Sequence, residues 1–116
     1  DRCPPDVLEK AIAIMATLNR GASEAMLEVG AHAATDVTGF GLLGHLRNMT
    51  EASGVGARVR MSRIPLMEGV MDLAAQDLFP GGTRRNLEAL EGYVRWSNAL
   101  SPTEKIKLGL QQLAER

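Results

Sequence analysis

One stretch constrains the fold of this 116-residue chain more than any other: residues 34–46, with the sequence ATDVTGFGLLGHL. It begins as a short β-branched run, passes through Gly39 and Gly41, and continues with leucines at helical spacing. We therefore predict a strand over 35–38 that ends in a tight turn at the N-terminus of a helix. Such a turn suits an anion, because the first N–H groups of a helix lack intrahelical acceptors and the helix dipole is positive there.

Two features of this turn point to phosphate chemistry. The glycines allow a phosphate to approach the backbone closely. Just upstream, Asp36 supplies a carboxylate of the kind that holds a Mg²⁺ ion bridging to phosphate oxygens. The same spacing also occurs in ordinary strand-to-helix turns with a solvated or capping aspartate. The pattern alone therefore leaves both a phosphate site and a plain structural turn open.

Three blocks of the sequence resemble the C-terminal domain of the selenophosphate synthetase (selenide, water dikinase) family. They are ATDVTGFGLLGHL at 34–46, EASGVGARV at 51–59 and FPGGTRRNLEAL at 79–90. The spacing between the blocks also fits that family. Related ATP-using families of the same superfamily, such as aminoimidazole ribonucleotide synthetase and thiamine-phosphate kinase, differ in the first block. The resemblance is therefore specific to the family and not only to the fold.

The resemblance implies a fold, a reaction and a site. The expected fold is α+β (layered α/β), a mixed β-sheet packed with helices, with residues 1–116 as a single domain and a fragment of a longer two-domain enzyme. The implied reaction converts ATP, selenide and water to selenophosphate, phosphate and AMP, with Mg²⁺ and ATP as cofactors. The implied metal ligand is Asp36. The residues expected to shape the loop that faces the nucleotide phosphates are Thr38, Gly39, Phe40 and Gly41.

Several family features are missing from this chain. The Gly-rich N-terminal segment and the reactive Cys/Lys pair of the family belong to its N-terminal domain, and the surroundings of Cys3 do not match that pair. After Leu108 the chain departs from the expected family continuation. We therefore expect no catalytic residue here, an inactive isolated chain, a missing N-terminal domain as partner, and a homodimer in the full-length protein. A non-catalytic scaffold or interaction domain, or a domain of another synthetase or kinase of the superfamily, remains the alternative.

Composition limits the partners. The chain carries 13 basic and 14 acidic residues and has a net charge of −1, so no long-range field favours nucleic acid or an anionic membrane. Its longest apolar run, 11–16, is far too short to span a bilayer, and no signal peptide is recognisable. The single cysteine, Cys3, excludes an intrachain disulfide framework. We expect a cytoplasmic protein that binds neither nucleic acid nor membrane.

The remaining elements are predicted from periodicity and end signals. Helices are expected over 6–18 (with Asp6 as N-cap), 23–28, 42–53, 66–76 and from Ser101 onward, and strands over 57–62 and 93–96. Gly21 and Gly54 are expected to stop the helices before them, and Ser101 and Glu104 are expected to form a capping box ahead of the last helix. The first helix should bury one face, made of Leu8, Ile12, Met15 and Leu18. In the last helix Ile106, Leu110 and Leu113 should continue an inner face.

Gly81-Gly82 forms a second Gly-rich turn, before Thr83 as predicted N-cap and the pair Arg84 and Arg85. It fits either a second anion site, because arginine matches phosphate bidentately, or a capped turn with surface arginines. The two histidines, His32 and His45, have no second His or Cys at metal-binding spacing. Both are interpreted as polar residues without a ligand role.

Overall fold

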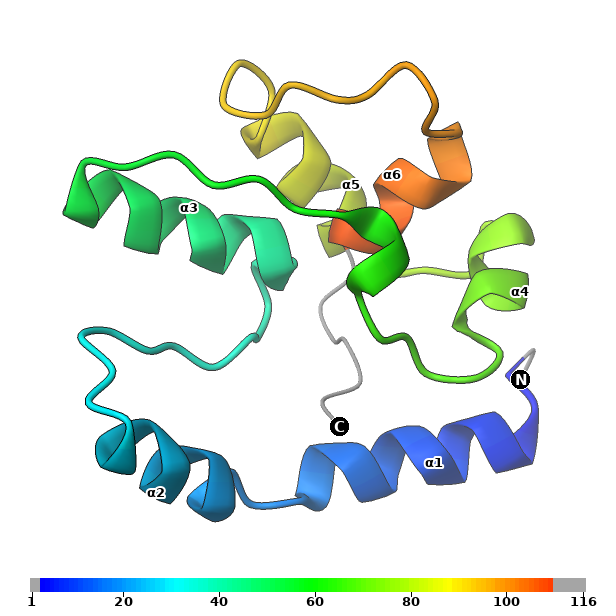
Figure 1. The fold of residues 1–116 in the computed structure, drawn as a ribbon. Helices are drawn as coiled ribbons and strands as arrows, with labels where there is room; N and C mark the ends of the chain where they lie inside the picture. Colours follow the sequence, from blue (N-terminus) through cyan, green and yellow to red (C-terminus); the bar gives the residue numbers. More distant parts are fainter. Residues whose placement is uncertain (1–2, 110–116) are drawn as a thin grey trace.

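The structure is a computed structural model that describes residues 3–109. Figure 1 shows that this part of the chain is helical, with long loops between short helices. The elements are α1 (Pro5–Ala16), α2 (Arg20–Glu28), α3 (Gly41–Ser53), the 3-10 helix η1 (Met61–Arg63), α4 (Val70–Ala75), α5 (Gly81–Ala89) and α6 (Pro102–Gly109). Of these helices, none combines the length and the apolar composition that crossing a bilayer requires.

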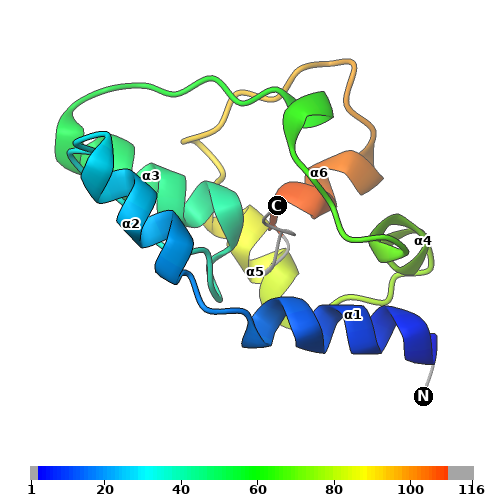
Figure 2. The same ribbon diagram turned by 60° about the horizontal axis from the view of Figure 1, so that its bottom comes forward.

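The predicted mixed sheet is wrong for the described residues, none of which lies in a strand. The segments 33–38 and 55–60 have no regular structure, and they run along opposite sides of α3 (Figures 1 and 2). A strand needs a hydrogen-bonded neighbour, and neither segment has one here. The alternating residues Ala57 and Val59, expected on a buried strand face, are accordingly exposed. The predicted strand over 93–96 is likewise turn and coil.

The core lies where α3 meets α5. Its centre is Leu43 from α3 and Leu90 at the end of α5, both buried. Partly buried apolar side chains pack around this pair, with Trp96 as the one aromatic anchor among them: Leu42, Leu46, Met61, Ile64, Val94 and Trp96. Helix α6 packs against α3, α4 and α5 and so closes this side of the molecule.

Helix α1 does not bury the face predicted for it. Leu8, Ile12 and Met15 are 50%, 52% and 53% exposed. The residue that α1 buries is Val7, which packs on the turn at Gly69. A Cβ atom at Gly69 would lie only 2.8 Å from a Val7 methyl group. Helix α1 therefore packs against the turn at Gly69 through Val7 in its first turn, and the apolar face predicted to be buried is about half exposed.

Two predicted helix ends are confirmed. Helix α3 ends at Gly54 in the left-handed conformation, as expected of a C-terminal glycine. Ahead of α6, the Ser101 Oγ accepts from the Glu104 N–H at 3.3 Å, and the Ser101 N–H donates to the Glu104 carboxylate at 2.8 Å. This reciprocal pair is the predicted capping box. The predicted inner face of the last helix falls at Ile106, whose side chain is not described, and at Leu110 and Leu113, which lie outside the described residues.

Other predicted ends are shifted. Helix α1 begins at Pro5, so Asp6 lies inside the first turn instead of capping it. Gly21, expected to stop α1, lies within α2. The predicted helix over 66–76 is reduced to α4. Gly69, with φ +81°, is not helical, and α4 begins at the residue after it.

Candidate functional site

The loop before α3 is a tight turn. The Gly41 N–H donates to the Thr38 carbonyl at 2.9 Å, which closes a four-residue turn with Gly39 and Phe40 at its centre. Gly41, the first residue of α3, has φ +71° and is buried. This left-handed conformation favours glycine. The sequence therefore fixes the turn at the position predicted for the phosphate-facing loop.

His45 holds the start of this turn. Its Nε2 atom lies 3.1 Å from the Thr38 backbone N, which donates to it, and 3.1 Å from the Thr38 Oγ1 atom. The His45 ring also lies against the Phe40 ring, with centroids 5.9 Å apart and planes tilted by 58°. One side chain from the second turn of α3 thus contacts both the first residue of the loop and Phe40 at its centre.

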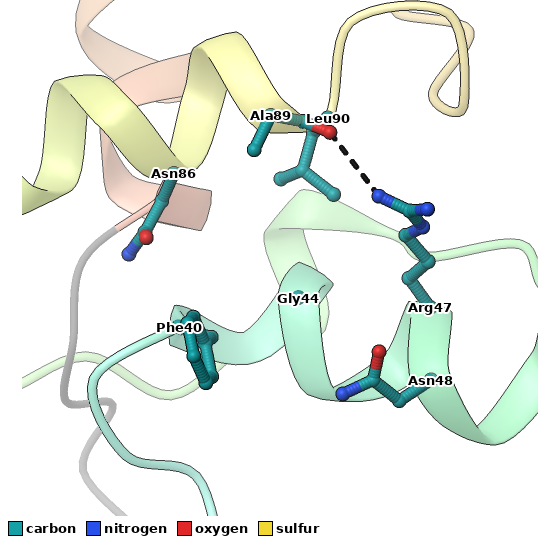
Figure 3. Close-up of a pocket in the computed structure, with 7 residues that line it drawn as sticks. All are labelled: Phe40, Gly44, Arg47, Asn48, Asn86, Ala89 and Leu90. Carbon is teal, nitrogen blue, oxygen red and sulfur yellow. Dashed lines mark hydrogen bonds between the residues drawn. The ribbon is translucent and has the colours of Figure 1, made fainter.

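Asn86 holds the loop from the opposite side. Its Nδ2 atom donates to the Gly39 carbonyl at 2.9 Å across 47 residues of sequence. A second hydrogen bond joins α3 to α5: the Arg47 guanidinium donates to the Ala89 carbonyl at 3.3 Å (Figure 3). The first and third of the sequence blocks that carry the family resemblance therefore meet in space.

A pocket of about 280 Å³ lies between the loop, α3 and α5 (Figure 3). Its lining is partly apolar, with two side-chain amides, and consists of Phe40, Gly44, Arg47, Asn48, Asn86, Ala89 and Leu90. The close approach of the loop to α3 depends on the glycine in this lining. A Cβ atom on Gly44 would lie 2.9 Å from the Phe40 Cβ. Arg47 is not available for a ligand charge, because it pairs with Glu51 at 3.0 Å and covers the Tyr93 ring at 3.3 Å.

The turn leaves donors unused. Among the described residues, no acceptor is found for the backbone N–H groups of Gly39, Phe40, Leu42 and Leu43, and no side chain caps the N-terminus of α3. These groups include first-turn N–H groups, which attract anions because they are unpaired and lie at the positive end of the helix dipole. The arrangement can therefore accept an oxyanion at the turn.

Asp36 lies two residues before this turn, in the extended segment, and is exposed. Its carboxylate makes no hydrogen bond or ion pair with the described residues. Residues 3–109 contain no group of three or more His, Cys, Asp or Glu side chains that could hold a metal. A single free carboxylate fits Mg²⁺, which uses one or two carboxylates and takes its other ligands from phosphates and water. It does not fit an ion that needs a full set of protein ligands.

The second Gly-rich stretch forms the first turn of α5, so the prediction of Thr83 as N-cap is wrong. Thr83 is fully buried, and its Oγ1 atom has no hydrogen-bond partner in the part of the chain that the structure describes. Arg84 is occupied by Asp77, at 3.4 Å, and by the Phe79 ring. Arg85 is exposed, and one of its guanidinium nitrogens lies 3.8 Å from where a Cβ on Gly81 would be. This geometry leaves both interpretations of the turn open.

Sequence reasoning missed two residues of the site. The sequence indicates for His45 only a polar residue without a ligand role, whereas its side chain contacts Thr38 and Phe40. Its position in the second turn of the helix that follows the loop is a signal that could have found it. Asn86 was part of a recognised block but had no assigned role, because nothing local indicates a contact 47 residues away.

The sequence that builds this region matches a known family. Residues 5–91 match the family described as AIR synthase related protein, C-terminal domain. The chain belongs to this family. The matched range contains the loop, α3 and α5, and so covers every residue of the candidate site described above.

The relatives compared here are all named selenide, water dikinase. The chain is 41% identical over 105 residues to the selenide, water dikinase of Carboxydothermus hydrogenoformans. This match covers 90% of this chain and 30% of the relative. It is 47% identical over 94 residues to that of Caldanaerobacter subterraneus subsp. tengcongensis, covering 81% of this chain and 27% of the relative. It is 49% identical over 86 residues to that of Geobacter metallireducens, covering 74% of this chain and 25% of the relative. The predicted resemblance to selenide, water dikinases is confirmed, and the chain spans less than a third of the length of these relatives.

Proposed function

We propose that this chain is the C-terminal-domain part of a selenide, water dikinase, which converts ATP, selenide and water to selenophosphate, phosphate and AMP. The observation that carries the proposal is that 41–49% identity to proteins of that name extends over the segment that builds the loop before α3. The unpaired N–H groups of that loop support it independently, because they suit a phosphate.

Asp36 is the proposed Mg²⁺ ligand of the site. A carboxylate close to a phosphate-facing turn can hold the ion against the phosphate oxygens, and among the described residues Asp36 has no partner that would occupy it. When bound, Mg²⁺ would neutralise the charge of the phosphates. The role of this chain's own residues would be to position the Asp36 carboxylate and to direct the N–H donors of Gly39 and Phe40 toward the same phosphate oxygens.

Further parts of the proposal concern the whole protein. The rest of the enzyme, including its N-terminal domain, would supply the remaining ATP and selenide contacts, and a homodimer in the cytoplasm would be the working form. The isolated chain should then show no selenide-dependent ATP turnover, because it lacks those contacts. Turnover by the isolated chain would contradict this division of labour.

The test is Mg²⁺-dependent binding of β,γ-imido-ATP, measured by calorimetric titration. The chain is titrated alone and mixed with the N-terminal domain of the Carboxydothermus relative, as wild type, Asp36→Asn and Asp72→Asn. Asp72 is an exposed acid on α4, so its replacement makes the same charge change away from the loop. We expect binding in the mixture that weakens about tenfold or more in Asp36→Asn only. Absence of binding in every mixture, with the fold intact, would favour a non-catalytic scaffold domain.

A further inference from the structure

We propose that His45 is a positioning residue that fixes the loop 38–41 through its Nε2 atom, so that the unpaired N–H groups of the loop face an anionic ligand. The inference rests on the proposed function of the loop and names the side chain that sets its geometry. The carrying observation is the pair of 3.1 Å contacts from the His45 Nε2 atom to Thr38.

The chemistry of the contact determines the state of the imidazole. A backbone N–H can only donate, so the His45 Nε2 atom must accept from Thr38 and cannot carry a proton. The ring proton of the neutral imidazole is therefore on Nδ1. The Thr38 hydroxyl lies at the same distance and shares the acceptor. The contact thus requires an acceptor at the position of the Nε2 atom. A side chain of similar size that has no acceptor there cannot make the contact.

The loop needs such a contact because it is otherwise loosely specified. It contains Gly39, whose backbone has more accessible conformations than that of any other residue. The Asn86 amide holds the Gly39 carbonyl and the turn hydrogen bond holds Gly41, but neither fixes Thr38 from the side of its N–H. His45 does so from α3, a 13-residue helix whose first turns pack in the core. Groups held by a helix are positioned more precisely than groups held by a loop.

The contact also selects which donors remain free. Thr38 donates to His45, and Gly41 donates within the turn. Within residues 3–109, no acceptor is found for the N–H groups of Gly39, Phe40 and the first residues after Gly41. Loss of the His45 acceptor would release the Thr38 N–H and allow the peptide planes before Gly39 to rotate. The N–H groups of Gly39 and Phe40 would then no longer be held in one arrangement.

Two substitutions separate the acceptor from the ring. His45→Gln keeps an acceptor that reaches the Nε2 position but removes the ring that lies on Phe40. His45→Phe keeps a ring of similar size but has no acceptor. His45→Asn keeps an amide, but its shorter side chain corresponds to the Nδ1 position and falls short of Thr38. His45→Phe and His45→Asn are therefore both called acceptor-free variants here, because neither places an acceptor at the Nε2 position. A role in packing predicts damage from His45→Gln, whereas a role in positioning predicts damage from His45→Phe and His45→Asn.

The first measurement is hydrogen exchange of the Thr38 amide by NMR in this chain alone. We expect slow exchange in the wild type and in His45→Gln, and exchange about tenfold faster in the two acceptor-free variants, since one hydrogen bond is lost. Circular dichroism confirms that each variant is folded, and Asn replaces Phe if the latter is not. Equal Thr38 exchange in the wild type and a folded acceptor-free variant would overturn the proposal.

The second measurement is the binding of Mg²⁺ and β,γ-imido-ATP in the mixture described above. The dissociation constant should rise about tenfold in His45→Phe and return to near the wild-type value in His45→Gln. Asp36→Asn should weaken binding without changing the exchange of the Thr38 amide, which separates the metal ligand from the positioning residue. If the wild type binds no nucleotide, the proposed function fails while the Thr38 exchange still decides the role of His45. Full binding by a folded His45→Phe variant would overturn the positioning role.

Discussion

The region around α3 and α5 and the region formed by α1 and α2 both carry apolar side chains but use them differently. In the first region, Leu43 and Leu90 are buried and the loop 38–41 is held by side chains from both helices. In the second, the apolar face of α1 is about half exposed, and Leu27 on α2 is 80% exposed. The described contacts therefore fix the candidate site much more firmly than they fix the N-terminal helices.

The difference teaches that an amphipathic pattern and its burial are separate facts. Leu8, Ile12 and Met15 of α1 have helical spacing, and α1 forms where they occur. Their burial needs a second surface, which the described residues do not supply. The predictions below test this contrast, beginning with the largest expected effect.

Replacing one leucine in each region gives the sharpest contrast in stability. Leu90→Ala removes a side chain that is 3% exposed and should lower the free energy of unfolding by about 2–5 kcal/mol. Leu27→Ala, at 80% exposure, should change it by no more than about 0.5 kcal/mol. Urea denaturation measures both values. Equal losses would show that the two regions are packed alike.

Gly69→Ala tests the attachment of α1. The substitution places a Cβ 2.8 Å from a Val7 methyl group at a residue with φ +81°, so we expect a loss of about 1–3 kcal/mol and faster amide exchange in α1. Gly92→Ala is the matched control, because Gly92 has φ +84° and open space around it. Its cost reports backbone strain alone. If the two substitutions cost the same, the contact between Val7 and the Gly69 turn does not attach α1.

Gly44→Ala tests the closeness of the loop to α3. Alanine in a helix is favoured over glycine by up to about 1 kcal/mol, and Gly21→Ala in α2, with no atom within 4 Å, should gain that amount. At Gly44 the new Cβ would meet the Phe40 Cβ at 2.9 Å, which should cancel the gain. Thermal denaturation compares the variants. An equal rise in melting temperature would mean that Phe40 moves away freely.

The smallest effect concerns the ion pair between Lys10 and Glu68, the charged contact of α1 with the turn before α4. The hydrogen bond and the charge of Glu68 raise the pKa of Lys10 above its ordinary value. A raised lysine pKa stabilises the fold fully below the ordinary value of about 10.4, and the contribution is lost as the pH rises through the folded-state pKa.

Lys10→Gln should therefore be slightly less stable than the wild type at neutral pH, and the difference should close at strongly alkaline pH. Both side chains are largely exposed, so high salt should also reduce the difference. Urea denaturation across pH measures this. A difference that persists unchanged above the lysine range would assign the effect to packing of the Lys10 stem.

Where the sequence predicted the structure, the signal was local. The end of α3 at Gly54 and the capping box at Ser101 and Glu104 each depend on a few adjacent residues, and both are confirmed. The glycine turn before α3 also formed where predicted, since Gly41 adopts the left-handed conformation that the residue type allows. The roles proposed for Asp36 and for the loop remain predictions.

Where prediction failed, the outcome depended on a distant partner. The alternation over 57–62 gives strand propensity, but a strand requires a neighbour, and the segment is instead coil followed by η1. The roles of His45 and Asn86 depend on which side chains α3 and α5 direct at the loop. Such contacts follow from packing, which periodicity does not encode.

The most direct test of the account is hydrogen exchange of the chain, mixed with the N-terminal domain of the Carboxydothermus relative, with and without Mg²⁺ and β,γ-imido-ATP. The account predicts that the nucleotide slows exchange in residues 38–44 and leaves α2 unchanged, and that Asp36→Asn abolishes the effect. Protection that appears in α1 and α2 but not in 38–44, or that is the same in Asp36→Asn, would contradict the assignment of the loop before α3 as the ligand-facing part of this chain.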